Sequence, residues 1–362
     1  MVKSHNKDIL TEVILKMSIS FSGAKKYKKH NGLSSLSIIK KPLAAPVYYY
    51  RLKCGDIMLN PLVKTDDYVF KGEKIADLDI FDAVPVHSGV SGKVLAVYED
   101  MIAIENDDIY RTCAPMDFGK EFEALTSREL LWIMRENGVC ETRTGTPMHV
   151  LLGRQKTPSC IIVCCFDSDP YVSSPQVCAM NNAEKILSSL DIIFKILGIK
   201  KAIIATEGTV GNIYSDFKYL LRFNEDISLY SLKPRYPQSD NDILIKTVTG
   251  HENEKANALV LSAETLLNMW EVFERKMPVT DKVVTVSGDD ILPPDNFRVP
   301  LGTPVSALLT SSGYLEPEII INGGVIDGEI IIDNETPVTR TTKAILAFND
   351  KKNIPRYRKE PI

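Results

Sequence analysis

The side chains most able to do chemistry unaided are cysteines and histidines, and their spacing gives them no shared site. The seven cysteines include the adjacent pair Cys164 and Cys165, but none forms a CxxC pair and none follows Cys178. A zinc or iron–sulfur site requires close, repeated spacings. The five histidines are scattered, and no Ser/His/Asp or Cys/His set stands out. We therefore expect free, mostly buried thiols and no metal site in this chain.

The composition is ordinary for a globular protein, and no overall basic charge argues for nucleic acid. Hydrophobic residues make up 44% and charged residues 25% of the 362 residues, and the net charge is −4 with both signs interspersed. No apolar run approaches the roughly 18–20 residues that span a bilayer. Within residues 9–17 the apolar residues recur at helical spacing and are interrupted by Glu12 and Lys16. This pattern is not the continuous apolar core of a signal peptide. These features predict two or three domains, no transmembrane segment, no nucleic-acid partner and a cytoplasmic location.

A basic stretch of small residues, Ser22–Ser35, follows this N-terminal helix. We interpret it as a solvated connector, because a run of like charges is usually a solvated surface. The alternative is a contact with an acidic partner or a membrane surface.

Short strands and turns alternate at regular offsets within Lys64–Val97. Pairs containing Asp, Ser, Lys and Gly supply the turns, and β-branched residues supply the strands between them. This rhythm resembles the barrel-sandwich module of biotinyl and lipoyl carrier domains. Such carriers need a modifiable lysine in the central hairpin, whereas the corresponding Asp77–Ala83 contains none. The sequence therefore predicts the barrel-sandwich module without its carrier chemistry. His87 lies within the turns of this module, and we interpret it as a structural or surface histidine.

From about Ser127 the pattern changes to alternating helices and strands. The first helix takes Ser127 as its capping residue, with Glu129 close behind, and stops at Gly138. The segments that continue the alternation are strands at Cys160–Phe166, Lys201–Thr206 and Ile227–Leu232, and helices at Asn182–Leu197 and Ile213–Leu221. Repeated βα units predict a largely parallel sheet, in which ligands bind at the carboxyl ends of the strands.

The last third of the chain has a different character. After a helix at Glu264–Arg275 come strands, a Pro-rich turn and a short helix that starts near Pro304. Further strands are expected within residues 318–332. This pattern indicates a small β-grasp domain.

Four stretches of this sequence match stretches of one protein family, and the parts of the chain follow the same order as in that family. They are VPVHSGVSGKV at Val84–Val94, RYPQSD at Arg235–Asp240, the run Thr285–Leu309, and TPVTRTTKAILAF at Thr336–Phe348. With them, the chain resembles the C subunit of the Rnf electron-transport complex. It is also similar to the proline-reductase-associated electron-transfer protein and to the flavin subunit of respiratory complex I.

The resemblance implies an α+β multidomain fold. Its parts are a barrel-sandwich (biotinyl/lipoyl-like) β module, a Rossmann-like α/β layer of the FMN- and NADH-binding type, and a β-grasp domain of the SLBB type. The implied boundaries are an N-terminal helix and connector (1–35), the barrel-sandwich domain (36–120), the α/β domain (121–255), a helix with the β-grasp domain (256–350) and a tail (351–362).

The resemblance also implies bound FMN and NADH, and it assigns their binding residues by position. The family's glycine-rich phosphate loop is similar to Glu141–Leu152, where the assigned residues are Arg143, Gly145, Thr146 and Pro147. The string CCFDSDPY assigns Asp167, Asp169 and Tyr171, and the string SAETLLNMWE assigns Glu264 and Thr265. Structural alternatives stay open, because Asp is a common turn residue before proline and Ser262 is a good helix N-cap.

The chain departs from the family pattern in several places. Glu141 and Arg143 stand where the family has glycines, and a carboxylate is unfavourable in a phosphate cradle, although Arg143 could act as a phosphate ligand. Cys164 replaces an asparagine. Family members carry two runs of the CxxCxxCxxxCP type after the segment that matches Thr336–Phe348, and no such run follows here. No iron–sulfur cluster is therefore expected in this chain.

Two functions fit these observations. One is an RnfC-like electron-transfer protein, an NADH-dependent flavin oxidoreductase subunit that passes electrons from FMN to a partner protein. Its partners would be other Rnf-type redox subunits, through which it would associate with a membrane. The other is a degenerate, non-catalytic paralogue that serves as a scaffold or interaction subunit of a redox complex. The retained acidic residues favour the first function, and the substituted glycines favour the second.

Overall fold

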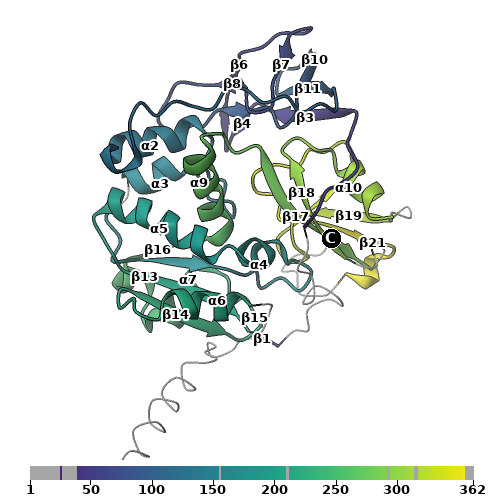
Figure 1. Ribbon diagram of the computed structural model, residues 1–362. Coiled ribbons are helices and arrows are strands. Elements are labelled where there is room, and N and C mark those ends of the chain that lie inside the picture. Colours follow the sequence, from purple (N-terminus) through teal and green to yellow (C-terminus); the bar gives the residue numbers. More distant parts are fainter. Residues whose placement is uncertain are drawn as a thin grey trace, which may run out of the picture.

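The computed structural model describes residues 25–26, 39–154, 156–208, 212–289, 291, 294–313 and 317–354. Within these residues three modules pack around a common centre, with the β module above an α/β layer and a β-grasp module (Figure 1). The expected N-terminal helix lies outside the described residues, as do most of the basic connector and residues 355–362 of the tail. The predicted fold class is confirmed by this architecture.

The β module consists of short strands around its own apolar core. Two of its sheets have the strand orders β3-β11-β10-β7 and β6-β8-β9, and β4 pairs with β5. The strands are β3 (Val47–Arg51), β4 (Lys53–Cys54), β5 (Ile57–Met58), β6 (Asn60–Pro61), β7 (Tyr68–Val69), β8 (Lys74–Asp77), β9 (Val86–His87), β10 (Gly92–Val97) and β11 (Met101–Asn106). Tyr48 and Tyr50 alternate into the core with the period-2 pattern of a half-buried strand. His87 is buried, and this burial lowers its pKa to about 3, so it is a structural histidine.

The α/β layer has a four-stranded parallel sheet of order β14-β13-β12-β16, as the alternation predicted. Its strands are β12 (Cys160–Cys164), β13 (Ala202–Glu207), β14 (Ile227–Leu232) and β16 (Ala258–Ser262). Its helices are α2 (Ser127–Glu136), α3 (Met148–Arg154), α4 (Ser174–Ala179), α5 (Ala183–Leu197), α6 (Ile213–Leu220), α7 (Asn241–Thr249), α8 (Asn253–Ala256) and α9 (Ala263–Arg275), with a short helix η2 (Phe122–Ala124) before them. Apolar residues of α2, α3, α5, α6 and α9 form the larger core, and α7 covers the other face.

Two details of this layer differ from the expectations. The boundary predicted between residues 255 and 256 cuts the sheet, because β16 pairs with β12 along its whole length. The cap of α2 is Thr126, one residue earlier than the expected Ser127. Thr126 accepts a hydrogen bond from the backbone of Glu129, whose side chain accepts one from the backbone of Thr126. This reciprocal capping box satisfies two donors that a helix end would otherwise leave free.

The β-grasp module is a mixed six-stranded sheet of order β2-β18-β17-β21-β19-β20, and the helix that follows β18 packs on it. Its elements are β2 (Ile39–Lys40), β17 (Asp281–Gly288), β18 (Asp295–Pro300), α10 (Val305–Ser311), β19 (Ile319–Asn322), β20 (Glu329–Ile331), β21 (Ala344–Phe348) and η3 (Lys351–Asn353). A separate pair, β1 (Lys25–Lys26) and β15 (Arg235–Tyr236), joins the N-terminal segment to the α/β layer. The expected helix near Pro304 is confirmed, since Pro304 is the N-cap of α10.

The central hairpin of the β module is clamped onto the α/β layer. The ring of Phe81 lies 5.1 Å from that of His149, and the guanidinium of Arg154 lies 4.6 Å from the Phe81 centroid. Below the tip, Asp77 forms an ion pair of 2.9 Å with Arg135 of α2. A carrier domain would use this hairpin as a mobile arm, whereas here its side chains join two modules.

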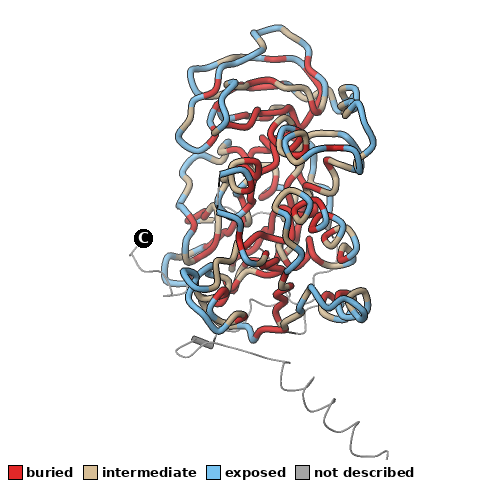
Figure 2. The backbone as a smooth tube through the Cα atoms, turned by 90° about the vertical axis from the view of Figure 1, so that its left-hand side faces the viewer, coloured by how far each residue is buried: buried red, intermediate tan, exposed pale blue. Residues whose placement is uncertain are grey.

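Buried residues concentrate in the interior of the molecule, and the outer turns of the β module are exposed (Figure 2). All seven cysteines lie within the described residues, none forms a disulfide, and five are buried, as expected for free thiols. In the described part of the chain we find no helix of the length and hydrophobicity needed to cross a bilayer.

Candidate functional site

A cavity of about 540 Å³ lies where the carboxyl ends of β12 and β16 face the β-grasp module. The α/β layer contributes Cys164, the loop of residues 166–169, Ser262 and Glu264. The β-grasp module contributes Lys282, residues of the turn after β19, and residues 341–343. The volume falls within the range of about 300–1,000 Å³ common for small-molecule sites. The cavity therefore occupies the position that the βα alternation predicted.

The residues assigned from the sequence divide into two groups. Arg143, Asp167, Asp169 and Glu264 line the cavity. The others, which are not among its lining residues, are Gly145, Thr146, Pro147, Tyr171 and Thr265. Tyr171 packs edge-to-face against Phe348 at 5.5 Å between ring centroids. Thr265 is buried and accepts a hydrogen bond of 2.9 Å from the backbone of Thr142, which makes it a structural residue of the α9 start.

Lys343 of the β-grasp module ties the acidic loop of the α/β layer to its own module. Its ammonium group lies 3.0 Å from Asp167 and 2.8 Å from Asp327. Burial alone would raise the pKa of Asp167, but the charge of Lys343 and hydrogen bonds outweigh burial, so the pKa is lowered. Asp167 is therefore an ionised partner of an intermodule ion pair.

Asp169 stands beside Asp167 but has the opposite electrostatics. Burial, reinforced by the nearby Asp167 charge, raises the pKa of Asp169 to about 7. Its carboxyl group accepts hydrogen bonds from the backbone of Tyr171 at 2.9 Å and from that of Ile326 at 3.2 Å. Gly324 permits this approach, because a Cβ there would lie 2.3 Å from the Asp169 carboxyl oxygen. Asp169 thus links the two modules across the cavity.

Glu264 forms a buried ion pair with Lys282, and the two side chains are 6% and 2% exposed. Its second oxygen accepts a hydrogen bond of 3.3 Å from the backbone of Val283. The carboxylate is therefore occupied by β17, the first strand of the β-grasp sheet. This geometry satisfies a buried charge that would otherwise be costly.

In the loop that corresponds to the phosphate loop, residues 141–146 have no backbone N–H group left for a ligand. The N–H groups of residues 141 to 146 all donate within the protein, and their acceptors are, in chain order, Thr146 O, Thr265 Oγ1, the Glu141 carboxylate, Glu141 O, Glu141 O and Thr144 Oγ1. Binding of a phosphate by a loop requires several backbone N–H groups that converge on the anion. These residues therefore do not fit a flavin phosphate.

Sequence reasoning missed the β-grasp side of the cavity. Lys343 lies inside the family-like string Thr336–Phe348, and Lys282 lies three residues before the run Thr285–Leu309, so each was visible but had no predicted partner. Ser239 was also missed; its hydroxyl contacts Ser168, and its carbonyl accepts a hydrogen bond from Arg143. In sequence, 71 residues separate Ser239 from Ser168 and 176 separate Lys343 from Asp167, distances over which local patterns reveal no contact. Lys282 lies only 18 residues from Glu264, but the two residues belong to different modules.

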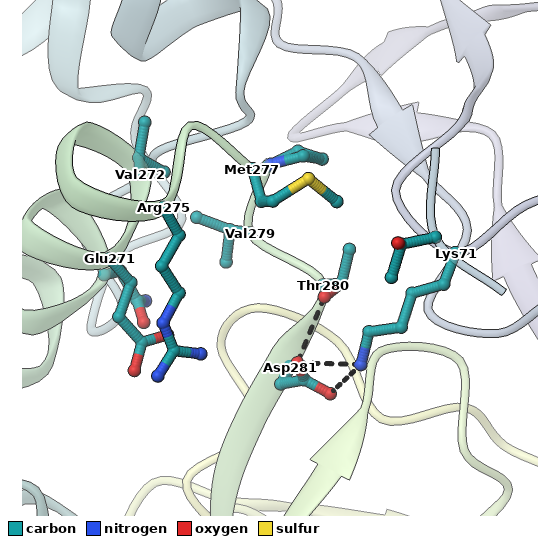
Figure 3. A pocket seen from close by; sticks show the side chains of 11 residues that line it. Lys71, Glu271, Val272, Arg275, Met277, Val279, Thr280 and Asp281 are labelled. Atoms are coloured by element: carbon teal, nitrogen blue, oxygen red, sulfur yellow. Dashed lines mark hydrogen bonds and ion pairs between the residues drawn. The ribbon is translucent and has the colours of Figure 1, made fainter. Parts of the chain in front are cut away.

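A second pocket, of about 180 Å³, lies where all three modules meet (Figure 3). Glu271 and Arg275 extend from α9, and Lys71 reaches from the β module to Asp281 at the start of β17. The Lys71–Asp281 ion pair has a distance of 2.9 Å, and Thr280 donates to the same carboxylate at 3.0 Å. These contacts connect the β module to the β-grasp module.

Two family models match this chain. Residues 20–113 match the RnfC barrel sandwich hybrid domain, and residues 135–270 match the Nuo51 FMN-binding domain. The chain is RnfC-like. The second match spans β16 and most of α9, in agreement with the sheet order and not with the predicted boundary at 255.

Curated relatives agree with this assignment. The RnfC-like chain is 26% identical to the C subunit of the Na(+)-translocating ferredoxin:NAD(+) oxidoreductase complex of Acetobacterium woodii, over 80% of this chain and 70% of that protein. It is 26% identical to the C subunit of the proton-translocating ferredoxin:NAD(+) oxidoreductase complex of Clostridium ljungdahlii, over 80% of this chain and 67% of that protein. It is 25% identical to the C subunit of the ion-translocating oxidoreductase complex of Pasteurella multocida, of which it spans only 38%.

A solved structure shares the fold of the RnfC-like chain. A crystal structure of an NAD+-reducing NiFe-hydrogenase superposes with a TM-score of 0.50 at 16% identity, over 63% of this chain and 48% of that one. At this identity the likeness concerns the fold alone. By its family matches and its relatives, the chain is similar to subunits of redox complexes.

Proposed function

We propose that this RnfC-like chain serves a redox complex as a structural and interaction subunit, without an FMN of its own. The observation that carries the proposal is the hydrogen bonding of residues 141–146, whose backbone donors are all used within the protein. A flavin phosphate would have to break these bonds and displace a buried carboxylate. Each of these hydrogen bonds is expected to contribute about 0.5–1.5 kcal/mol to stability.

The charges around the cavity support the same proposal. The lining contains more carboxyl groups than cationic groups; the acids are Asp167, Asp169, Asp240, Glu264, Asp327 and Glu329, and the bases are Arg143, Lys282 and Lys343. Both lysines already pair with carboxylates of the lining. An incoming phosphate would therefore meet net negative charge, which disfavours its binding.

The partners that we propose are other subunits of an Rnf-type redox complex. The relatives are named as C subunits of ferredoxin:NAD(+) oxidoreductase complexes that translocate ions. An ion-translocating complex includes a path through a membrane, so we place this chain at the periphery of such a complex, attached through its partners.

NADH oxidation through FMN is the second candidate. The observation that favours it is the cavity itself, which lies at the carboxyl edge of a parallel sheet and has Asp167, Asp169 and Glu264 in its lining. In this case the ligand would have to be held by side chains and not by loop N–H groups.

Titration of the purified full-length chain with FMN separates the two candidates. We expect no quenching of flavin fluorescence and no NADH-dependent flavin bleaching, because the N–H groups of residues 141–146 are all used within the protein. An R143Q variant, which removes the guanidinium group from the loop, should behave like the wild type. Stoichiometric FMN binding followed by reduction with NADH would establish the second candidate and overturn the first.

A further inference from the structure

The β-grasp sheet has one covered edge and one open edge. At the first, β2 from the N-terminal segment pairs in parallel with β18. At the second, β20 pairs with β19 on one side and with no other strand of the described residues. The outward backbone groups of such an edge strand are free to pair with a further strand. β20 is therefore a place at which an extended segment can join the sheet.

The side chains at this edge are apolar on the face opposite α10. Ile331 lies opposite Ile320, which belongs to the core beneath α10. Ile330 lies opposite Ile321, which belongs to the core on the other face of the sheet. Ile330 is 40% exposed, and Ile332, the residue after the strand, is 98% exposed. Single exposed isoleucines are ordinary, but these two lie together at an open strand edge, beside a buried core that an added strand would extend.

The charge around β20 has one sign. Residues 299–339 contain six acidic residues and neither lysine nor arginine. Glu329 opens the strand, Asp333 and Glu335 follow it, and all three are exposed. None of these three carboxylates takes part in an ion pair with another described residue. Opposite charges across paired strands stabilise the pairing, and like charges destabilise it. The edge therefore favours a basic strand and disfavours a second copy of itself.

We propose that β20 is a docking edge for an extended, basic segment of a partner protein, which adds a strand to the β-grasp sheet. The apolar side chains of that segment cover Ile330 and Ile332, and its lysines or arginines face Glu329 and Asp333. Glu329 also lines the cavity between the α/β layer and the β-grasp module, so the docked segment reaches the cavity rim. The proposal deepens the proposed function and rests on it in one respect, namely that the chain acts by binding partners.

A fluorescein-labelled peptide of about seven residues, in which lysine and valine alternate, is the probe for the full-length chain. Fluorescence anisotropy should show saturable binding at low ionic strength that weakens as salt is added. The variant I330T/I332T keeps β-branched residues but removes the apolar cover, and its affinity should be about tenfold lower or less than that. Equal affinities of the wild type and this variant would overturn the proposal.

The matched control is I109T, which makes the same change at an isoleucine after β11 that is 58% exposed. It should bind the peptide like the wild type. A loss of affinity in I109T equal to that in I330T/I332T would show that the peptide does not select β20, and it would overturn the proposal.

Two further peptides separate strand addition from attraction between charges. The same peptide N-methylated at every residue keeps its charge but has no backbone N–H group to pair, so its affinity should fall about tenfold or more. A peptide of alternating glutamate and valine should not bind, because its charge has the sign of the edge. Unchanged affinity of the N-methylated peptide, or binding of the acidic one, would overturn the proposal.

Sedimentation equilibrium without peptide tests the other occupant of the edge, a second copy of this chain. We expect the wild type and I330T/I332T to have the same mass. A wild-type dimer that this variant dissociates would assign the edge to self-pairing and overturn the proposal. These results are independent of the FMN titration, because flavin binding would overturn the proposed function and leave the peptide affinities to decide the role of β20.

Discussion

At the residue scale, the two neighbouring carboxyl groups of the acidic loop behave differently because their partners differ. Asp167 has Lys343 at 3.0 Å and a lowered pKa, whereas Asp169 has backbone donors and a raised pKa. For a buried carboxylate, a backbone N–H group offsets the loss of hydration less than an ammonium group does. In the sequence DSD the two aspartates cannot be told apart. Only their contacts in the fold show that Asp167 is an ion-pair partner and that Asp169 has a raised pKa.

The raised pKa of Asp169 predicts how stability depends on pH. Between its ordinary value of 3.8 and about 7, the folded state binds more protons at this site than the unfolded state does. The stabilisation is therefore complete below the ordinary pKa and is lost as the pH rises through about 7, with a slope of at most about 1.4 kcal/mol per pH unit. The D169N variant should lack this contribution.

Urea unfolding of wild type and D169N at several pH values between about 4 and about 8 measures this effect. D169N is expected to lose stability at every pH, because one backbone donor loses its acceptor, but with a flatter dependence on pH in this window. Equal slopes in the two proteins would contradict the assignment.

At the element scale, local signals placed most helices and strands, and tertiary contacts decided what joins them. The helix α5, the strands β12 to β14 and the helix α10 lie where periodicity and caps indicated. The start of α2 was misplaced by one residue, because Thr and Ser are both good caps and occur side by side. The central hairpin was predicted to lack carrier chemistry, but its contact with α3 required the structure.

The cap of α2 gives a direct test at this scale. T126A should lower the free energy of unfolding by about 1 kcal/mol, since it removes the side chain of a capping box. S127A should change it by only a few tenths, because Ser127 lies inside the first turn and is not the cap. Chemical denaturation of both variants checks this prediction, and a larger effect of S127A would place the cap at Ser127 instead.

At the scale of the whole molecule, charged pairs across module boundaries hold the site together. Lys282 with Glu264, and Lys343 with Asp167, each join the α/β layer to the β-grasp module. Lys71 with Asp281 joins the β module to the β-grasp module. The cavity therefore depends on the relative position of modules, and each pair is a point at which that position can be tested.

The Lys282–Glu264 pair is buried deeply enough to give a large effect. K282M leaves the Glu264 carboxylate without its charged partner and should lower the free energy of unfolding by about 3–5 kcal/mol. The double variant K282M/E264L replaces both charges with apolar groups and should recover much of this loss. Equilibrium unfolding of the two single variants and the double variant measures the coupling. A purely additive double variant would show that the pair does not link the modules energetically.

The sequence by itself determined the local helices and strands and the parallel sheet, and it predicted a site at the carboxyl ends of the strands. These follow from hydrophobic periodicity, turn residues and caps, which act over a few residues, whereas the order of the modules came from the family resemblance. The tertiary structure decided which residues meet in that cavity and what the substituted loop does. Lys343 reaches Asp167 across 176 positions, and Ser262 meets Glu141 across 121. Such contacts depend on how elements pack, so the closed state of the loop could be read only from the fold.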